Sequence, residues 1–213
     1  MTEAHHGHGP HATRLATRAI KLEQTTIAYN LVEGVVAIVA GVGAGLVSLV
    51  GFGVDSGIEV AAAGVVLHRL YADIRGGEVD EAKERRALRF VAVTFFALAG
   101  YVTIEGVRNL VTGETPDTSV VGIGLTALSV VLMPTLAVLK RRTGEALGSR
   151  LVIADAKETM LCAWLSASTF IGLAAFSAFG WSWLDSAAGF VIAYFAVQEG
   201  REAWEGELVC DDD

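Results

Sequence analysis

The sequence has few of the features that mark a soluble domain, a disulfide-linked domain or a nucleic-acid-binding protein. Charged residues make up 19% of the 213 residues, below the roughly 25% of typical soluble domains. Two cysteines, Cys162 and Cys210, are too few for a disulfide framework. The net charge of −8 argues against nucleic acid as a partner. No Ser/His pair, H-E-x-x-H motif or paired glycine-rich loop indicates an enzyme, so we expect neither catalysis nor an organic cofactor.

Long apolar runs take the place of those features. The chain is 53% hydrophobic with a mean hydropathy of +0.50, and its apolar runs repeatedly reach the ~20 residues that cross a bilayer. Each span must be a helix, because backbone amides left unpaired in hydrocarbon cost several kcal/mol apiece. The sequence therefore predicts an all-α polytopic membrane protein. We expect six transmembrane helices, at 27–47, 50–72, 88–110, 119–139, 151–176 and 183–199.

The basic residues predict an orientation in the bilayer. Fourteen of the 16 Lys and Arg residues lie before the first span or after the second, fourth and sixth. Arg108 lies near the other side, and Lys157 lies within a span. The positive-inside rule then places both termini in the cytoplasm. We expect a flexible His-containing tail (1–26), a six-helix transmembrane domain (27–204) and an acidic tail (205–213), in a multi-pass protein of the cell membrane.

Two acidic residues lie inside the second predicted span. Asp55 and Glu59 are four residues apart, so they share one helix face. Acids within spans are costly and usually face a bundle interior, a cavity or a partner. Two adjacent carboxylates repel each other, and either a divalent cation between them or protonation of one relieves that repulsion. Alternatively, Asp55 caps the helix near the outer surface and Glu59 faces water.

A polar stripe opens the fifth span, in the segment ADAKETMLC. Asp155, Glu158, Thr159 and Cys162 follow helical spacing, so they lie along one face. Glu158 and Cys162 fall near the middle of a ~30 Å hydrocarbon core. Together with the acid pair of the second span, they could form a four-ligand metal site. Alternatively, the stripe belongs to an ion-pair network in which Lys157 neutralises Asp155 or Glu33.

Three further polar residues lie in or near the predicted spans. Asn30 and Glu33, one turn apart in the first span, could line an inner vestibule. Asn30 could equally form a hydrogen bond with another helix. Asp185 opens the sixth span in an Asp-Ser pair, which is typical of a helix N-cap.

Four of the five histidines lie in the N-terminal tail. Glycine and proline interleave them, so we expect the tail to be disordered. His-rich tracts bind zinc, nickel or copper through neutral imidazole. The tail could gather metal near a cytoplasmic entrance, or its histidines could be incidental. These candidate ligands are His5, His6, His8 and His11.

The six spans, the acid pair and the polar stripe resemble the transmembrane domain of the cation diffusion facilitator family. The segments GFGVDSGIEV, MPTLAVLKRRTGEALGSR, ADAKETMLCAWLSA and VQEGREAWEGE are similar to a bacterial branch of that family. The family places a metal site between its second and fifth helices, with a pair of ligands four residues apart in each. Asp55 and Glu59 match the first pair. Glu158 stands where histidine is usual in the second pair, and Cys162 stands where aspartate is usual.

The resemblance implies an exporter of a divalent transition metal (Zn, Mn, Fe or Co) that exchanges its substrate metal for protons by alternating access. Asp155 would serve as a fifth ligand or as a proton carrier. No cytoplasmic metal-binding domain follows the sixth span, so the implied homodimer would form through membrane helices. The carboxylates favour harder ions such as Mn(II), whereas Cys162 favours Zn(II). The alternative is a metal-responsive membrane protein that regulates or partners another transporter.

Overall fold

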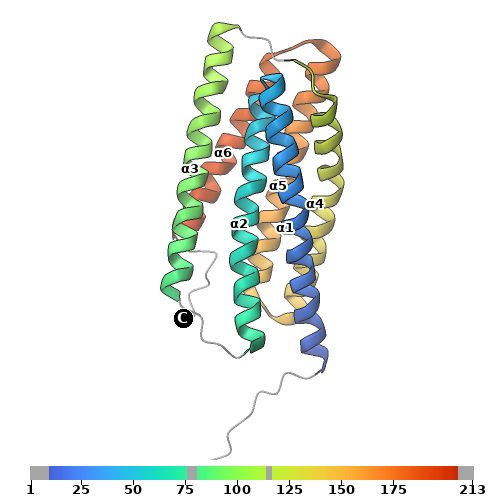
Figure 1. Cartoon of the computed structure of the whole chain (residues 1–213), viewed down its shortest axis with the longest axis vertical. Coiled ribbons are helices and arrows are strands. Elements are labelled where there is room, and N and C mark those ends of the chain that lie inside the picture. The colour runs from blue at the N-terminus through green and yellow to red at the C-terminus, as the bar shows by residue number, and fades with distance from the viewer. Residues whose placement is uncertain (1–9, 76–80, 114–116, 206–213) are drawn as a thin grey trace, which may run out of the picture.

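The computed structural model of the chain describes residues 10–75, 81–113 and 117–205, and these residues are helical apart from short connections. Long helices run side by side along the bundle (Figure 1). The all-α class is therefore confirmed. By length and composition, four helices are apolar enough to cross a membrane within the described ranges: Arg14–Ala44, Val47–Ala72, Val120–Leu147 and Leu151–Phe179. In the described part of the chain the helices are α1 (Pro10–Ala44), α2 (Val47–Arg75), α3 (Glu81–Thr112), α4 (Val120–Leu147), α5 (Arg150–Phe179) and α6 (Trp183–Glu205).

The helices associate as three close pairs: α1 with α2, α4 with α5, and α3 with α6. Helix α2 also contacts α3, α5 and α6, so it occupies the centre of the bundle (Figure 1). The main apolar cluster surrounds it, with Phe52 of α2, Leu98 of α3, Leu173 of α5 and Ile192 of α6 all buried. The polar face of α2 therefore looks toward α5 and α6 rather than toward the outside.

Short polar and glycine connections end one helix and begin the next. Gly148 and Gly180 close α4 and α5 with φ angles of 67° and 70°, in the left-handed region that glycine adopts without strain. Ser119 and Ser149 then accept hydrogen bonds from the first-turn amides of α4 and α5. Such tight turns hold consecutive helices antiparallel, which brings the start of α5 back beside the end of α4.

Helix α1 begins earlier than the first predicted span. The structure is helical from Pro10, so it differs from the flexible tail expected through residue 26. The reason is tertiary packing, because Ala19 and Ile20 are buried in a small cluster with side chains of α2 and α5. His5, His6 and His8 lie outside the described residues, and the backbone of His11 lies in the first turn of α1.

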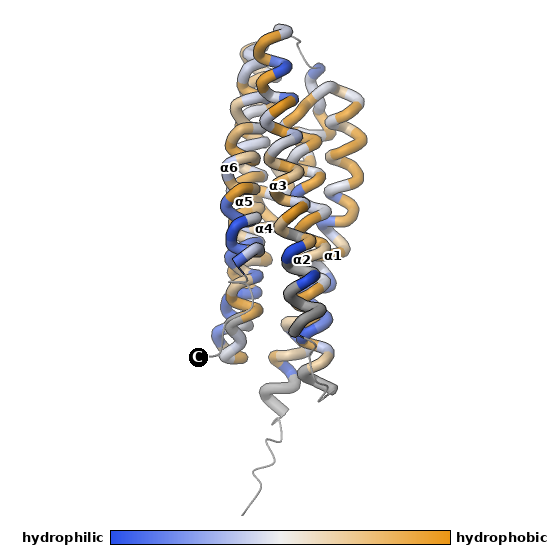
Figure 2. The backbone as a smooth tube through the Cα atoms, turned by 90° about the vertical axis from the view of Figure 1, so that its left-hand side faces the viewer, coloured by the Kyte–Doolittle hydropathy of each residue, from blue (hydrophilic) through white to orange (hydrophobic). Residues whose placement is uncertain are grey.

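The outer surface of the bundle is largely apolar. Large hydrophobic side chains point outward from most of the helices, such as Val39 (69% exposed), Ile104 (68%), Val120 (82%) and Ile171 (63%). Hydropathy along the chain is highest in the upper part of the bundle, and hydrophilic residues gather toward its lower end (Figure 2). A surface of this kind suits contact with lipid rather than with water.

Glycine lets α1 and α2 approach closely just before Asp55. A Cβ added to Gly53 would lie 2.9 Å from the Gly34 carbonyl oxygen and 2.9 Å from the Ile38 amide nitrogen. We expect Gly53→Ala to destabilise the bundle by about 1–3 kcal/mol, because the backbone atoms cannot move aside as a flexible side chain would. Thermal unfolding in detergent micelles measures this loss.

Gly57, one turn later in α2, provides the matched control for this substitution. It is exposed, and a Cβ there would meet nothing within 4 Å. Gly57→Ala should leave stability unchanged or raise it by up to ~1 kcal/mol, because alanine is the better helix former. Equal shifts for the two variants would mean that the close approach of α1 and α2 contributes nothing to stability.

Candidate metal site

The acid pair of α2 lies well inside the helix and inside the bundle. Because α2 begins at Val47, Asp55 and Glu59 occupy its third and fourth turns. Their exposed fractions are 3% and 5%. Neither oxygen of Glu59 has a hydrogen-bond partner within the described residues. The alternative in which Asp55 caps the helix and Glu59 faces water is therefore wrong.

The cap of α2 comes from another helix. Asp185 of α6 accepts hydrogen bonds from the Val47 amide (3.0 Å) and the Ser48 amide (3.2 Å). The Ser48 hydroxyl also donates to it at 2.5 Å. The prediction that Asp185 caps its own helix is wrong, because it is the third residue of α6 and turns inward toward α2. The local Asp-Ser motif could not reveal that the Asp185 carboxylate accepts hydrogen bonds from the amides of a different helix, α2.

The stripe of α5 faces the α2 acids across a small cavity. Asp55, Glu59, Glu158 and Cys162 all line it, so side chains predicted from two separate segments come together. The Cys162 thiol donates to Asp55 Oδ2 at 3.4 Å. The cavity measures about 20 Å³, which is room for one water-sized occupant. Apolar side chains complete the wall: Ala62, Phe95, Leu161 and Leu165.

Glu199 of α6 is a fifth polar residue of this cavity that sequence reasoning missed. It is 7% exposed, and its Oε1 has no hydrogen-bond partner in the described part of the chain. The sequence held one signal, since Glu199 lies two residues after Val197, the last residue of an apolar run. The sixth predicted span, 183–199, ends at Glu199, and Arg201 follows it. The structure instead turns Glu199 inward.

The carboxylate and thiol groups of this cavity line its wall but do not converge on a single point. Among the described residues, no three His, Cys, Asp or Glu side chains converge closely enough to hold a metal ion. The shared lining places carboxylate and thiol groups from three helices within one volume. Carboxylates and a thiolate suit a divalent transition metal, and rotamer changes would have to draw these groups together around it.

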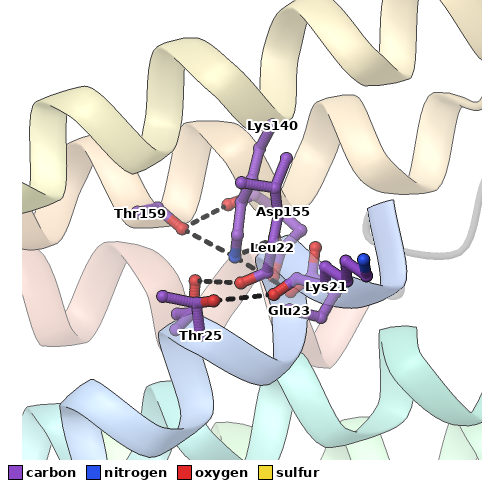
Figure 3. Close-up of polar contacts among 8 residues, drawn as sticks. Lys21, Leu22, Glu23, Thr25, Lys140, Asp155 and Thr159 are labelled. Carbon is purple, nitrogen blue, oxygen red and sulfur yellow. Dashed lines mark hydrogen bonds and ion pairs between the residues drawn. The ribbon is translucent and has the colours of Figure 1, made fainter. Parts of the chain in front are cut away.

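Asp155 does not line the cavity, because a lysine binds it one turn away. Lys140 of α4 is fully buried and lies 2.5 Å from Asp155 Oδ2 and 2.9 Å from Glu23 Oε2 of α1. It also donates to the Thr159 hydroxyl at 3.2 Å. Figure 3 shows the ammonium between the two carboxylates. The alternative of an ion-pair network therefore holds for Asp155, with Lys140 in place of the exposed Lys157.

This buried triad, Glu23–Lys140–Asp155, joins α1, α4 and α5 below the cavity. Lys140 lies after the fourth predicted span, which ends at residue 139, but α4 continues to Leu147 and Lys140 is buried within it. The triad holds one cation against two carboxylates, and the ion pairs of Lys140 are with Glu23 and Asp155 rather than with the acids of the cavity. Those acids remain without a basic partner within the described residues.

A family comparison covers more than half of the chain. Residues 87–206 match the cation efflux transmembrane domain. The matched segment includes Glu158, Cys162 and Glu199, whereas Asp55 and Glu59 precede it. A comparison with curated proteins finds no match. Acidic side chains meeting inside an apolar helical bundle agree with the matched domain, and the chain belongs to the cation diffusion facilitator family of membrane cation transporters.

Proposed function

We propose that the chain exports a divalent transition-metal ion by exchanging it for protons. The observation that carries this proposal is the cavity where acids of α2, α5 and α6 meet the Cys162 thiol with no basic residue among them. Groups of negative charge are expensive inside a membrane bundle. A bound divalent cation offsets that cost in the metal-loaded state, and bound protons offset it in the metal-free state.

The proposal includes the arrangement of the chain in the bilayer. All six helices cross the membrane with both termini in the cytoplasm, as the basic residues of the connections favour. The end of the bundle that carries the triad then faces the cytoplasm, and the aromatic turn at Phe179, Trp181 and Trp183 faces outward. These three rings stack on one another at centroid distances of 5.2 and 6.4 Å, as interfacial anchors do.

Transport would proceed by alternating access at the cavity. The ion enters from the cytoplasmic end, to which the histidines of the N-terminal tail deliver it, and binds Asp55, Glu59, Glu158 and Cys162. Glu199 adds a further carboxylate from α6. Four carboxylates and one thiol favour Mn(II), Fe(II), Co(II) or Zn(II) over Cu(I), which prefers sulfur ligands. The protein acts as a homodimer in the cell membrane, with contacts between membrane helices.

Metal uptake by sealed vesicles tests this function. Purified protein is reconstituted into liposomes with an acidic lumen, and Zn, Mn, Fe and Co are supplied outside. We expect uptake of at least one ion, with alkalinisation of the lumen, because protons leave as metal enters. Vesicles without protein provide the control. Saturable metal binding with no uptake would overturn the proposal and favour a metal-responsive protein that acts on another transporter.

A further inference from the structure

Glu33 of α1 is a buried acid that the metal cavity does not use. It is 1% exposed, and it does not appear in the cavity lining. Hydroxyl groups of three helices surround its carboxylate. Tyr29 of α1 donates to Oε1 at 3.0 Å, Ser56 of α2 donates to Oε2 at 3.1 Å, and Ser129 of α4 also donates to Oε1. The Tyr29 and Ser129 hydroxyls lie 2.6 Å apart.

This cage of hydroxyls contains no positive charge. Within the described residues, no Lys, Arg or His lies at ion-pair distance from Glu33, and the buried Lys140 is held by Glu23 and Asp155. The charged groups that act on Glu33 from α2 are Asp55 and Glu59, and both are negative. Hydroxyls alone do not offset a full charge at this depth, where an isolated ion is costly. The site therefore requires a bound cation.

The spacing of the oxygens selects a proton over a metal ion. The contacts of 2.6 and 3.0 Å lie within the range of about 2.5–3.0 Å that is typical of O–H···O hydrogen bonds, and the contact of 3.1 Å lies just beyond it. Each oxygen of the Glu33 carboxylate already lies at hydrogen-bond distance from a hydroxyl group, which is the arrangement that holds a proton. A proton on Oε2 would be donated to Ser56 Oγ, whose own hydrogen reaches the Phe52 carbonyl oxygen at 3.1 Å. The Oε1 atom would keep accepting from Tyr29 and Ser129.

We propose that Glu33 is a proton-binding site separate from the metal cavity, formed where α1, α2 and α4 meet. The site takes its proton from water on one side and releases it to water on the other, with no other bond made or broken. This inference rests on the proposed function, because it assigns one of the exchanged protons to a particular carboxyl.

The cage is linked to the metal cavity through α2. Ser56 contacts Glu33, and its neighbour Asp55 lines the cavity. A movement of α2 that reorients Asp55 also moves Ser56 away from Glu33. The carboxyl would then lose a hydrogen-bond partner and meet water, where it can ionise. Proton occupancy of Glu33 and the position of α2 thus bias each other, as linked equilibria must.

Glu33→Gln tests this site in the reconstituted vesicles. The glutamine amide keeps the shape of a protonated carboxyl group, but it cannot ionise and so cannot carry a proton. We expect exchange of internal for external metal at equal pH to stay within about twofold of the parent, because it moves no net proton. Metal uptake driven by a pH gradient should fall by about tenfold. A change of this size is typical of the effect of one binding site on a second site that is energetically coupled to it. Glu105→Gln, at a half-buried acid paired with Arg108 at 3.1 Å, should change neither rate.

Infrared difference spectroscopy gives a second readout that does not depend on transport. The carbonyl stretch of protonated carboxyl groups in the metal-free protein should lose one component in Glu33→Gln and none in Glu105→Gln. An unchanged band, or full pH-driven uptake by the variant, would overturn the inference. Loss of metal–metal exchange as well would overturn it too, since Glu33 would then support folding or metal binding. If the parent protein shows no metal movement at all, the proposed function fails instead.

Discussion

Replacing Asp55 by asparagine should lower metal uptake by about 100-fold or more. Loss of a residue that only supports a ligand typically costs 10–100-fold in metal affinity or activity, and Asp55 is proposed as a ligand itself. The amide keeps the size of the side chain but removes a negative charge from the cavity and weakens the contact with the Cys162 thiol. Initial rates of uptake into acid-loaded vesicles measure the effect.

Asp117 provides the matched control, because it is exposed in the connection before α4. Asp117→Asn should transport at the rate of the parent. Asp55→Asn should also keep the thermal stability of the parent or exceed it, since the substitution removes a buried charge near Glu59. Transport by Asp55→Asn at the parental rate would show that the ion crosses the bundle by a route outside this cavity.

Replacing Lys140 by methionine should destabilise the protein by about 3–5 kcal/mol, the usual cost of leaving a buried charge without its partner. Lys140 is fully buried, and both Glu23 and Asp155 depend on its ammonium group. Methionine fills nearly the same volume, so lost packing does not explain a change of this size. Unfolding in detergent micelles, followed by circular dichroism, measures the difference.

The next residue along α4 separates this effect from an ordinary ion pair. Arg141 pairs with Glu145 at 2.9 Å, but its side chain is 71% exposed. Arg141→Met should cost less than about 1 kcal/mol. A triple variant with Lys140→Met, Glu23→Gln and Asp155→Asn should regain most of the lost stability, because no buried charge remains. A triple variant as unstable as Lys140→Met would show that lost contacts, rather than unpaired charges, cause the defect.

The residues of the cavity could be predicted in part because helical spacing is a local property. Asp55 and Glu59 are four residues apart, as are Glu158 and Cys162, so the sequence alone placed each pair on one face. That these faces look toward each other follows from the central position of α2, which no local pattern encodes. The prediction of an all-α membrane bundle succeeded for the same reason, since apolar length is read directly from the chain.

Polar residues near the ends of apolar runs could not be placed from the sequence. Lys140 precedes Arg141 and Arg142, and it looked like the first of three cytoplasmic residues. Its burial depends on Glu23, which lies more than a hundred positions earlier. Glu199 was misplaced in the same way, as the last residue of a span. In each case the choice between membrane edge and bundle interior depends on side chains from distant helices.

The hydrogen bonds from Val47 and Ser48 to Asp185 have a consequence for biosynthesis. Two backbone amides that open the second helix find their acceptor on the sixth, which leaves the ribosome about 140 residues later. Until then those amides must stay bonded to water or to lipid headgroups. The upper end of α2 can settle into the bilayer only after α6 has been synthesised, so a nascent chain arrested before α6 exposes a defect that cellular quality control can recognise.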